Sequence, residues 1–167
     1  MDPSLKHRSV PSLDHMSPRD VTDVLANARG LQRAAEAGKT QPLLRGKKLG
    51  LLCEVDGDGD AALFRRAAVE LGAHVAHIRP SQSGLNTPQE VQHTARMLGR
   101  LYDAVECQGM DSALVQRVSK DAGVPVYDGI ASQDHPTATL AGLLDSDSTL
   151  ADKRRFVLQA VLLNTIA

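Results

Sequence analysis

The chain has 167 residues, which is enough for one domain with its own hydrophobic core. Its formal net charge of −1 argues against a general nucleic-acid or membrane-surface binder, so we expect neither partner. No apolar run approaches the ~20 residues that cross a bilayer, and the first four residues lack the pattern of a signal peptide. We therefore expect a cytoplasmic protein, with Cys53 and Cys107 as buried, reduced thiols.

The predicted elements alternate between helices and strands after a polar N-terminal arm at residues 1–16. Ser17 is expected to cap a first helix that ends near Gly38, because Pro18 and Asp20 are typical of a first helical turn. Apolar runs predict four strands, at 49–55, 74–78, 103–107 and 124–127. Helical periodicity predicts helices at 61–71, 88–101 and 111–122, followed by two more at about 136–145 and 152–165.

Strands that alternate with helices predict an α/β fold, here a single domain with a four-stranded parallel sheet between helices. Ligands of such folds bind beyond the carboxyl ends of the strands. Three loops meet that description, namely 56–60, 108–111 and 128–137. We expect any functional site to lie among them.

The loop 56–60 is the most informative of the three, and it reads Asp56, Gly57, Asp58, Gly59, Asp60. A strand-to-helix turn attracts anions, because helix N–H groups and the helix dipole point into it. Three carboxylates in this turn would instead repel phosphate. The spacing of the acids also fits the start of a calcium loop, but Ala61 and Ala67 stand where such a loop needs Gly and Glu. Asp56, Asp58 and Asp60 are thus weak metal candidates, and a solvated turn whose Asp side chains cap the helix is favoured.

His135 follows the fourth predicted strand and begins a helix. It is a catalytic candidate, since a His there can polarise a substrate carbonyl, but a neutral, hydrogen-bonded structural role is favoured. His74, His77 and His93 show no metal-ligand spacing. The chain has no glycine-rich phosphate fingerprint, nucleophile elbow or paired cysteine motif, so we expect no cofactor.

Several collinear motifs make the chain similar to the aspartate/ornithine carbamoyltransferase family, with ornithine-type members the nearer match. The resemblance covers residues 5–145. It is carried by Leu43-Leu44-Arg45-Gly46-Lys47, by the stretches 65–73, 80–83, 94–103 and 122–126, and by His135-Pro136-Thr137.

The resemblance implies that residues 17–145 form the amino-terminal, carbamoyl-phosphate-binding domain of such an enzyme. The family's second domain does not follow in this chain, yet the stretch 152–166 resembles the family's last helix, which packs back on the first domain. The resemblance therefore predicts a C-terminal helix docked on the same domain, joined through a polar linker at 145–151. It also implies a homo-oligomer, with a trimer favoured.

The resemblance further implies a degenerate site. The family's phosphate-binding motif falls on Gly57 to Ala61, its Arg after the third strand on Gln108, and two of its Gln residues on Ala138 and Gly84. Only His135 and Thr137 match the family. Losing two Arg contacts to phosphate costs roughly 3–6 kcal/mol, or about two to four powers of ten in affinity.

These patterns favour a catalytically inactive, transcarbamoylase-like protein that acts by ligand binding or assembly. One alternative is an enzyme of altered chemistry that uses His135 and the acids of 56–60 on a neutral or cationic ligand. Another is a sensor with weak carbamoyl-phosphate or amino-acid binding. The enzyme alternative requires a pocket formed by all three loops, whereas assembly requires only an intact subunit interface.

Overall fold

The computed structural model describes residues 16–57, 59–144 and 147–166. Nearly all of the predicted arm, Asp58, residues 145–146 of the predicted linker and Ala167 lie outside the described residues. Within the described ranges, no helix combines the length and the apolar character that crossing a membrane requires.

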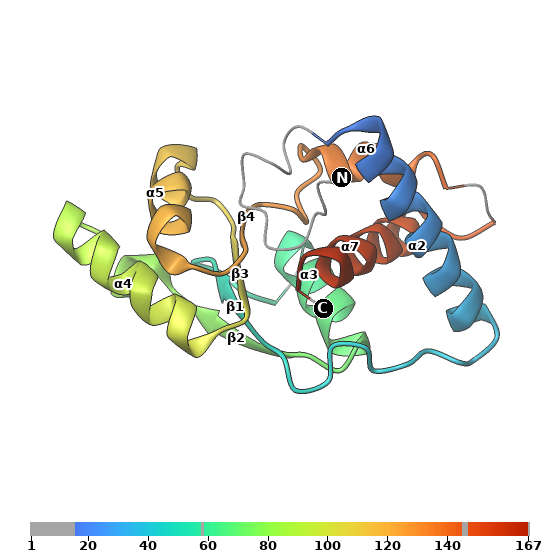
Figure 1. Ribbon diagram of the computed structural model, residues 1–167, viewed down its shortest axis with the longest axis horizontal. Helices are drawn as coiled ribbons and strands as arrows, with labels where there is room; N and C mark the ends of the chain where they lie inside the picture. The colour runs from blue at the N-terminus through green and yellow to red at the C-terminus, as the bar shows by residue number, and fades with distance from the viewer. Residues whose placement is uncertain (1–15, 58, 145–146, 167) are drawn as a thin grey trace.

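Four parallel strands form one sheet in the order β2-β1-β3-β4 (Figure 1). The predicted α/β class and the four-stranded parallel sheet are therefore confirmed. Because all strands point the same way, the loops that follow them gather at one edge of the sheet. The strands span β1 (Lys48–Leu52), β2 (His74–Ile78), β3 (Ala104–Cys107) and β4 (Val126–Asp128).

The first strand is shorter than the predicted run 49–55. It ends at Leu52, and the N–H group of Cys53 makes the last bond to β2, donating to the Ile78 carbonyl over 3.1 Å. The backbone then bends, and Gly57 adopts a φ of 126°, which disfavours residues with a side chain. The apolar Val55 is consequently 78% exposed rather than part of the sheet.

Helices cover both faces of the sheet, as Figure 1 shows. One face packs on α4 and α5 around Leu52, Val105 and Cys107, and the other packs on α2, α3, α6 and α7 around Leu49 and Leu51. Successive residues along each strand thus point to opposite faces and pack into two separate hydrophobic cores. The helices span α2 (Pro18–Glu36), α3 (Gly59–Glu70), η1 (Pro80–Gln82), α4 (Pro88–Leu101), α5 (Ser112–Ala122), α6 (Pro136–Ala141) and α7 (Leu150–Ile166).

The predicted cap of the first helix is confirmed. The Ser17 hydroxyl accepts a hydrogen bond from the Asp20 N–H group over 3.1 Å, and the Asp20 carboxylate accepts one from the Ser17 N–H group over 3.1 Å. This reciprocal capping box satisfies two backbone donors that the helix itself leaves unpaired. The predicted thiols are also confirmed as free and buried, and burial raises the pKa of both Cys53 and Cys107.

The C-terminal helix α7 packs against α2, α3 and α6. It buries polar as well as apolar side chains, since Arg155 and Gln159 are 7% and 2% exposed. The Arg155 Nε atom lies 2.7 Å from the Glu70 carboxylate, and the Gln159 amide donates to the Ala67 carbonyl over 3.2 Å. α7 is therefore a central helix with paired polar groups. The helix α6 before it ends at Ala141, short of the predicted 145.

Candidate functional site

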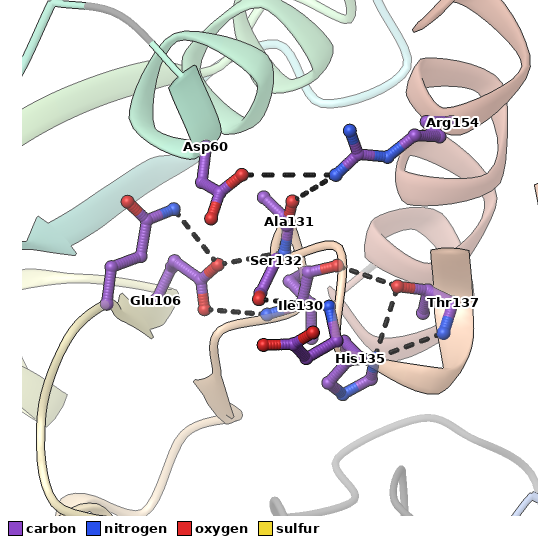
Figure 2. Close-up of polar contacts among 10 residues, drawn as sticks. Asp60, Glu106, Ile130, Ala131, Ser132, His135, Thr137 and Arg154 are labelled. Atoms are coloured by element: carbon purple, nitrogen blue, oxygen red, sulfur yellow. Dashed lines mark hydrogen bonds and ion pairs between the residues drawn. The ribbon is translucent and has the colours of Figure 1, made fainter. Parts of the chain in front are cut away.

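The loops after β1, β3 and β4 meet at the carboxyl edge of the sheet, next to the first turn of α7 (Figure 2). Figure 2 shows side chains from α3, β3, the β4–α6 loop and α7 pointing toward one another. This is the place where a parallel α/β sheet binds its ligands.

The acids of the first loop are paired with arginines. Asp56 forms an ion pair with Arg65 of α3, and the Asp60 carboxylate lies 4.0 Å from the Arg154 guanidinium of α7. Both carboxylates therefore make tertiary contacts, in addition to the solvated, helix-capping turn that the sequence favoured. Asp58 lies outside the described residues. Among the residues that are described, no three His, Cys, Asp or Glu side chains gather as a metal site.

Glu106 lies at the centre of the site, and sequence reasoning missed it. It is fully buried on β3, and its carboxyl oxygens accept hydrogen bonds from the N–H groups of Gly129, Ile130 and Ala131 over 3.0, 3.2 and 3.2 Å. Gln108, a predicted ligand contact, also donates to this carboxyl group over 3.4 Å. The N–H groups of the β4–α6 loop and the amide of Gln108 therefore bind a side chain of the protein itself.

Burial raises the pKa of Glu106 from 4.5 to about 8, although the N–H donors of Ala131, Ile130 and Gly129 and the Gln108 amide oppose the shift. Burial in a medium of low polarity disfavours the charged form, which is the dominant effect here. The neighbouring Cys107 and Tyr127 have raised pKa values, again chiefly by burial.

This shift predicts how stability depends on pH. The folded state keeps a proton on Glu106 up to about pH 8, whereas the unfolded state releases it near pH 4.5. Its contribution to the free energy of unfolding should be fully present below pH 4.5 and fall as pH rises toward 8, by at most ~1.4 kcal/mol per pH unit. Urea unfolding at pH 5.5 and 8 should show a smaller difference for Glu106→Gln than for the wild type.

The exposed Glu36 supplies the control for that measurement, because Glu36→Gln removes the same carboxylate from a solvated position. This variant should keep the wild-type pH dependence. An unchanged pH dependence in Glu106→Gln would show that the buried carboxyl group does not titrate in this range.

Arg154 connects α7 to two of the loops. One guanidinium nitrogen donates to the Ala131 carbonyl over 2.6 Å and is the same atom that lies near Asp60 (Figure 2). The side chain of Arg154 is 17% exposed. The run Lys153-Arg154-Arg155 has the composition of a solvated helix start, so its pattern gave no signal of this inward contact.

His135 caps α6, as its position at a predicted helix start allowed. Its Nδ1 atom accepts a hydrogen bond from the Thr137 N–H group over 3.2 Å, and the Thr137 hydroxyl donates to the Ile130 carbonyl over 2.7 Å. The two residues are 7% and 3% exposed. The two family-matching residues thus fix the β4–α6 loop, a geometry that favours the structural role of His135.

A cavity of about 400 Å³ lies between the second and third loops, and none of the described residues of 56–60 lines it. Its wall includes Asp128, whose carboxylate accepts a hydrogen bond from the Ser112 hydroxyl over 2.8 Å. The other polar side chains that line it are Ser132, Asp134 and His135. This cavity joins two of the three predicted loops, and its described lining residues include two acids and no Lys or Arg.

The fold and the site together define an α/β domain whose ligand loops follow the strands of a parallel sheet. A family model described as "Aspartate/ornithine carbamoyltransferase, carbamoyl-P binding domain" matches residues 8–147. The chain belongs to this family, which confirms the resemblance drawn from its motifs.

Two curated relatives illustrate the match. The ornithine carbamoyltransferase of Actinobacillus pleuropneumoniae serotype 5b (strain L20) is 38% identical over 141 residues, which are 84% of this chain and 42% of the relative. The catabolic ornithine carbamoyltransferase of Burkholderia mallei (strain ATCC 23344) is 36% identical over 155 residues, which are 90% of this chain and 46% of the relative. The chain thus spans less than half the length of these relatives.

Two solved structures illustrate the likeness of the fold. Ornithine carbamoyltransferase from Pyrococcus furiosus superposes with a TM-score of 0.73 at 27% identity, covering 85% of this chain and 45% of that one. Aspartate transcarbamoylase from Trypanosoma cruzi, in complex with carbamoyl aspartate and phosphate, gives a TM-score of 0.67 at 24% identity. That match covers 83% of this chain and 45% of the other, and it shows the shared fold alone.

Proposed function

We propose that this protein is a non-catalytic member of the carbamoyltransferase family that acts by binding or by assembly. The proposal rests on the contacts at the site, where the polar groups of the protein already bind one another. Glu106 takes up the N–H groups of residues 129–131, and Arg154 contacts Asp60 and the Ala131 carbonyl. The N–H groups and the guanidinium that face this site therefore already have partners within the chain.

Charge supports the same conclusion. A transferase must hold the phosphate and neutralise charge as it develops in the transition state. Asp56 and Asp60 lie in the turn where the family has its phosphate motif, and Gln108 replaces an Arg. Arg65 and Arg154, which are both partly buried, each pair with a carboxylate of the protein, and this lowers what they can offer an anion.

An assay of carbamoyl transfer tests the proposal. With saturating carbamoyl phosphate and ornithine or aspartate, we expect no product above a buffer blank, because the loops lack the charge to stabilise the phosphate. An ornithine carbamoyltransferase assayed in parallel provides the positive control. Product that increases with the amount of this protein would contradict a non-catalytic role.

Assembly is the first way in which such a protein can act, and we propose a homotrimer by analogy with the family. The loop after β1 and the segment 80–90 would form the contact. Val55 in that loop is 78% exposed and apolar, which suits burial against a second copy. Light scattering should give about three times the 17.9 kDa of one chain, and a single species of one chain's mass would argue against assembly.

Ligand binding is a second candidate, and the cavity beside Asp128 and Asp134 favours it. Its two acids suit a neutral or cationic small molecule rather than a phosphate. A small-molecule ligand of this cavity would raise the melting temperature by mass action, and Asp128→Asn should reduce that increase.

A further inference from the structure

A larger hollow lies away from the three loops, between α2, the segment 39–43 and α7. Its volume is about 640 Å³, and no described residue of the loops after β1, β3 and β4 lines it. Figure 1 shows α2 and α7 side by side, and these two helices are in extensive contact. We call this hollow the α2–α7 groove.

The walls of the α2–α7 groove are mostly apolar. Leu31, Phe156 and Leu163 line it, together with Leu43, which is 50% exposed. Gly30 of α2 also lines the groove, and a Cβ atom built on it would meet nothing within 4 Å. The groove thus has room for an apolar body of ligand size, since small-molecule sites typically measure about 300–1,000 Å³.

The side-chain amide of Gln159 has a carbonyl oxygen that accepts no hydrogen bond from the described residues. Gln159 lines the groove and is 2% exposed, and its Nε2 atom donates to the Ala67 carbonyl, which fixes the orientation of the amide. No residue in the described ranges donates to its carbonyl oxygen. This oxygen is not among the buried unpartnered atoms, so it keeps access to solvent at the groove and is free to accept a hydrogen bond from an N–H or O–H group of a ligand.

The charges around the groove favour an anion. Glu70 lines it, but its carboxylate lies 2.7 Å from the Arg155 Nε atom, so its charge is compensated. Lys39 also lines the groove and forms no ion pair with any residue that the structure describes. A cation at the edge of an apolar groove complements an amphipathic molecule with a negative group.

We infer that the α2–α7 groove binds a small amphipathic molecule, with an apolar body, an N–H or O–H donor and one anionic group. The apolar body lies against Leu31, Phe156 and Leu163, the donor bonds the Gln159 carbonyl, and the anionic group faces Lys39. Within the part of the chain that the structure describes, this site shares no lining residue with the loops of the proposed function, so either proposal can fail without the other.

The dye 8-anilinonaphthalene-1-sulfonate is a suitable probe, since it combines a naphthalene and a phenyl group with an N–H group and a sulfonate. Fluorescence titration of the wild-type protein should show saturable binding of one dye per chain. Gly30→Leu fills the groove, and loss of the buried ring should weaken binding about tenfold or more. Because Leu is a better helix former than Gly, the variant should melt at the same or a higher temperature.

Asp23→Leu adds the same side chain to an exposed position of α2 outside the groove, and it should bind the dye as the wild type does. Non-saturable binding by the wild type would overturn the proposal. So would Gly30→Leu that binds like the wild type, or Asp23→Leu that weakens binding equally.

A second arm tests the charge. N-phenyl-1-naphthylamine keeps the rings and the N–H group of the dye but has no sulfonate. Lys39→Ala should weaken binding of the sulfonated dye up to about fivefold and leave binding of the neutral dye unchanged, as expected for an exposed ion pair. Equal effects on both dyes would contradict the preference for an anion.

Discussion

Truncation after Asp147, which removes α7, should leave a chain that is insoluble or does not unfold cooperatively. The helix buries Phe156, Val157, Leu158, Val161 and Leu162 to 5% exposure or less. At roughly 1.5–3 kcal/mol each, these side chains contribute roughly 8–15 kcal/mol, which matches the whole stability of a typical domain. Solubility, circular dichroism and thermal melting of the truncated chain test our proposal that this helix belongs to the same domain.

Single substitutions in α7 give a graded version of this test. Leu162 is 0% exposed, so Leu162→Ala should cost about 2–5 kcal/mol in the free energy of unfolding. Leu150, at the start of the same helix, is 61% exposed, and Leu150→Ala should change the free energy of unfolding by about 0.5 kcal/mol or less. A truncated chain that melts like the full one, or equal effects of the two substitutions, would mean that α7 is only an appendage.

Gly99→Ala should also strongly destabilise the protein. A Cβ atom at Gly99 of α4 would lie 1.7 Å from the Ala122 carbonyl oxygen, so the backbones of α4 and α5 would have to separate. Overpacking of this kind costs about 3 kcal/mol, which for a domain of this size lowers the melting temperature by roughly 6–12 °C. Differential scanning calorimetry measures the shift.

Gly30→Ala is the matched control, since Gly30 also lies within a helix but has open space around it. It should stabilise the protein by about 0.5–1 kcal/mol through helix propensity alone. If both variants behaved alike, the close contact between α4 and α5 would not exist in solution.

The fold was predictable from the sequence because its signals are local. The alternation of apolar runs with amphipathic stretches indicates a parallel sheet, and the pattern around Ser17 indicates its capping box. The strand and helix ends were less predictable, because the last residues of an element depend on its neighbours. α6 ends at Ala141 although the apolar pattern continues to Leu144, which is 2% exposed in the turn that follows.

The centre of the site was not predictable, because its contacts join distant parts of the chain. Glu106 lies within an apolar run, which indicates a buried carboxyl group but not its partners, and these come 23 to 25 residues later. Arg154 follows a cation and precedes another, so its sequence resembles a solvated face. Only the packing of α7 beneath the β4–α6 loop turns it inward.

We propose that the turn where the family binds phosphate does not accept phosphate in this protein. Calorimetric titration of carbamoyl phosphate into the protein, with inorganic phosphate in parallel, tests it most directly. We predict no saturable heat for either anion at millimolar concentration, because the loop acids repel them and Glu106 occupies the loop N–H groups. A dissociation constant below about 1 mM for carbamoyl phosphate would contradict the account.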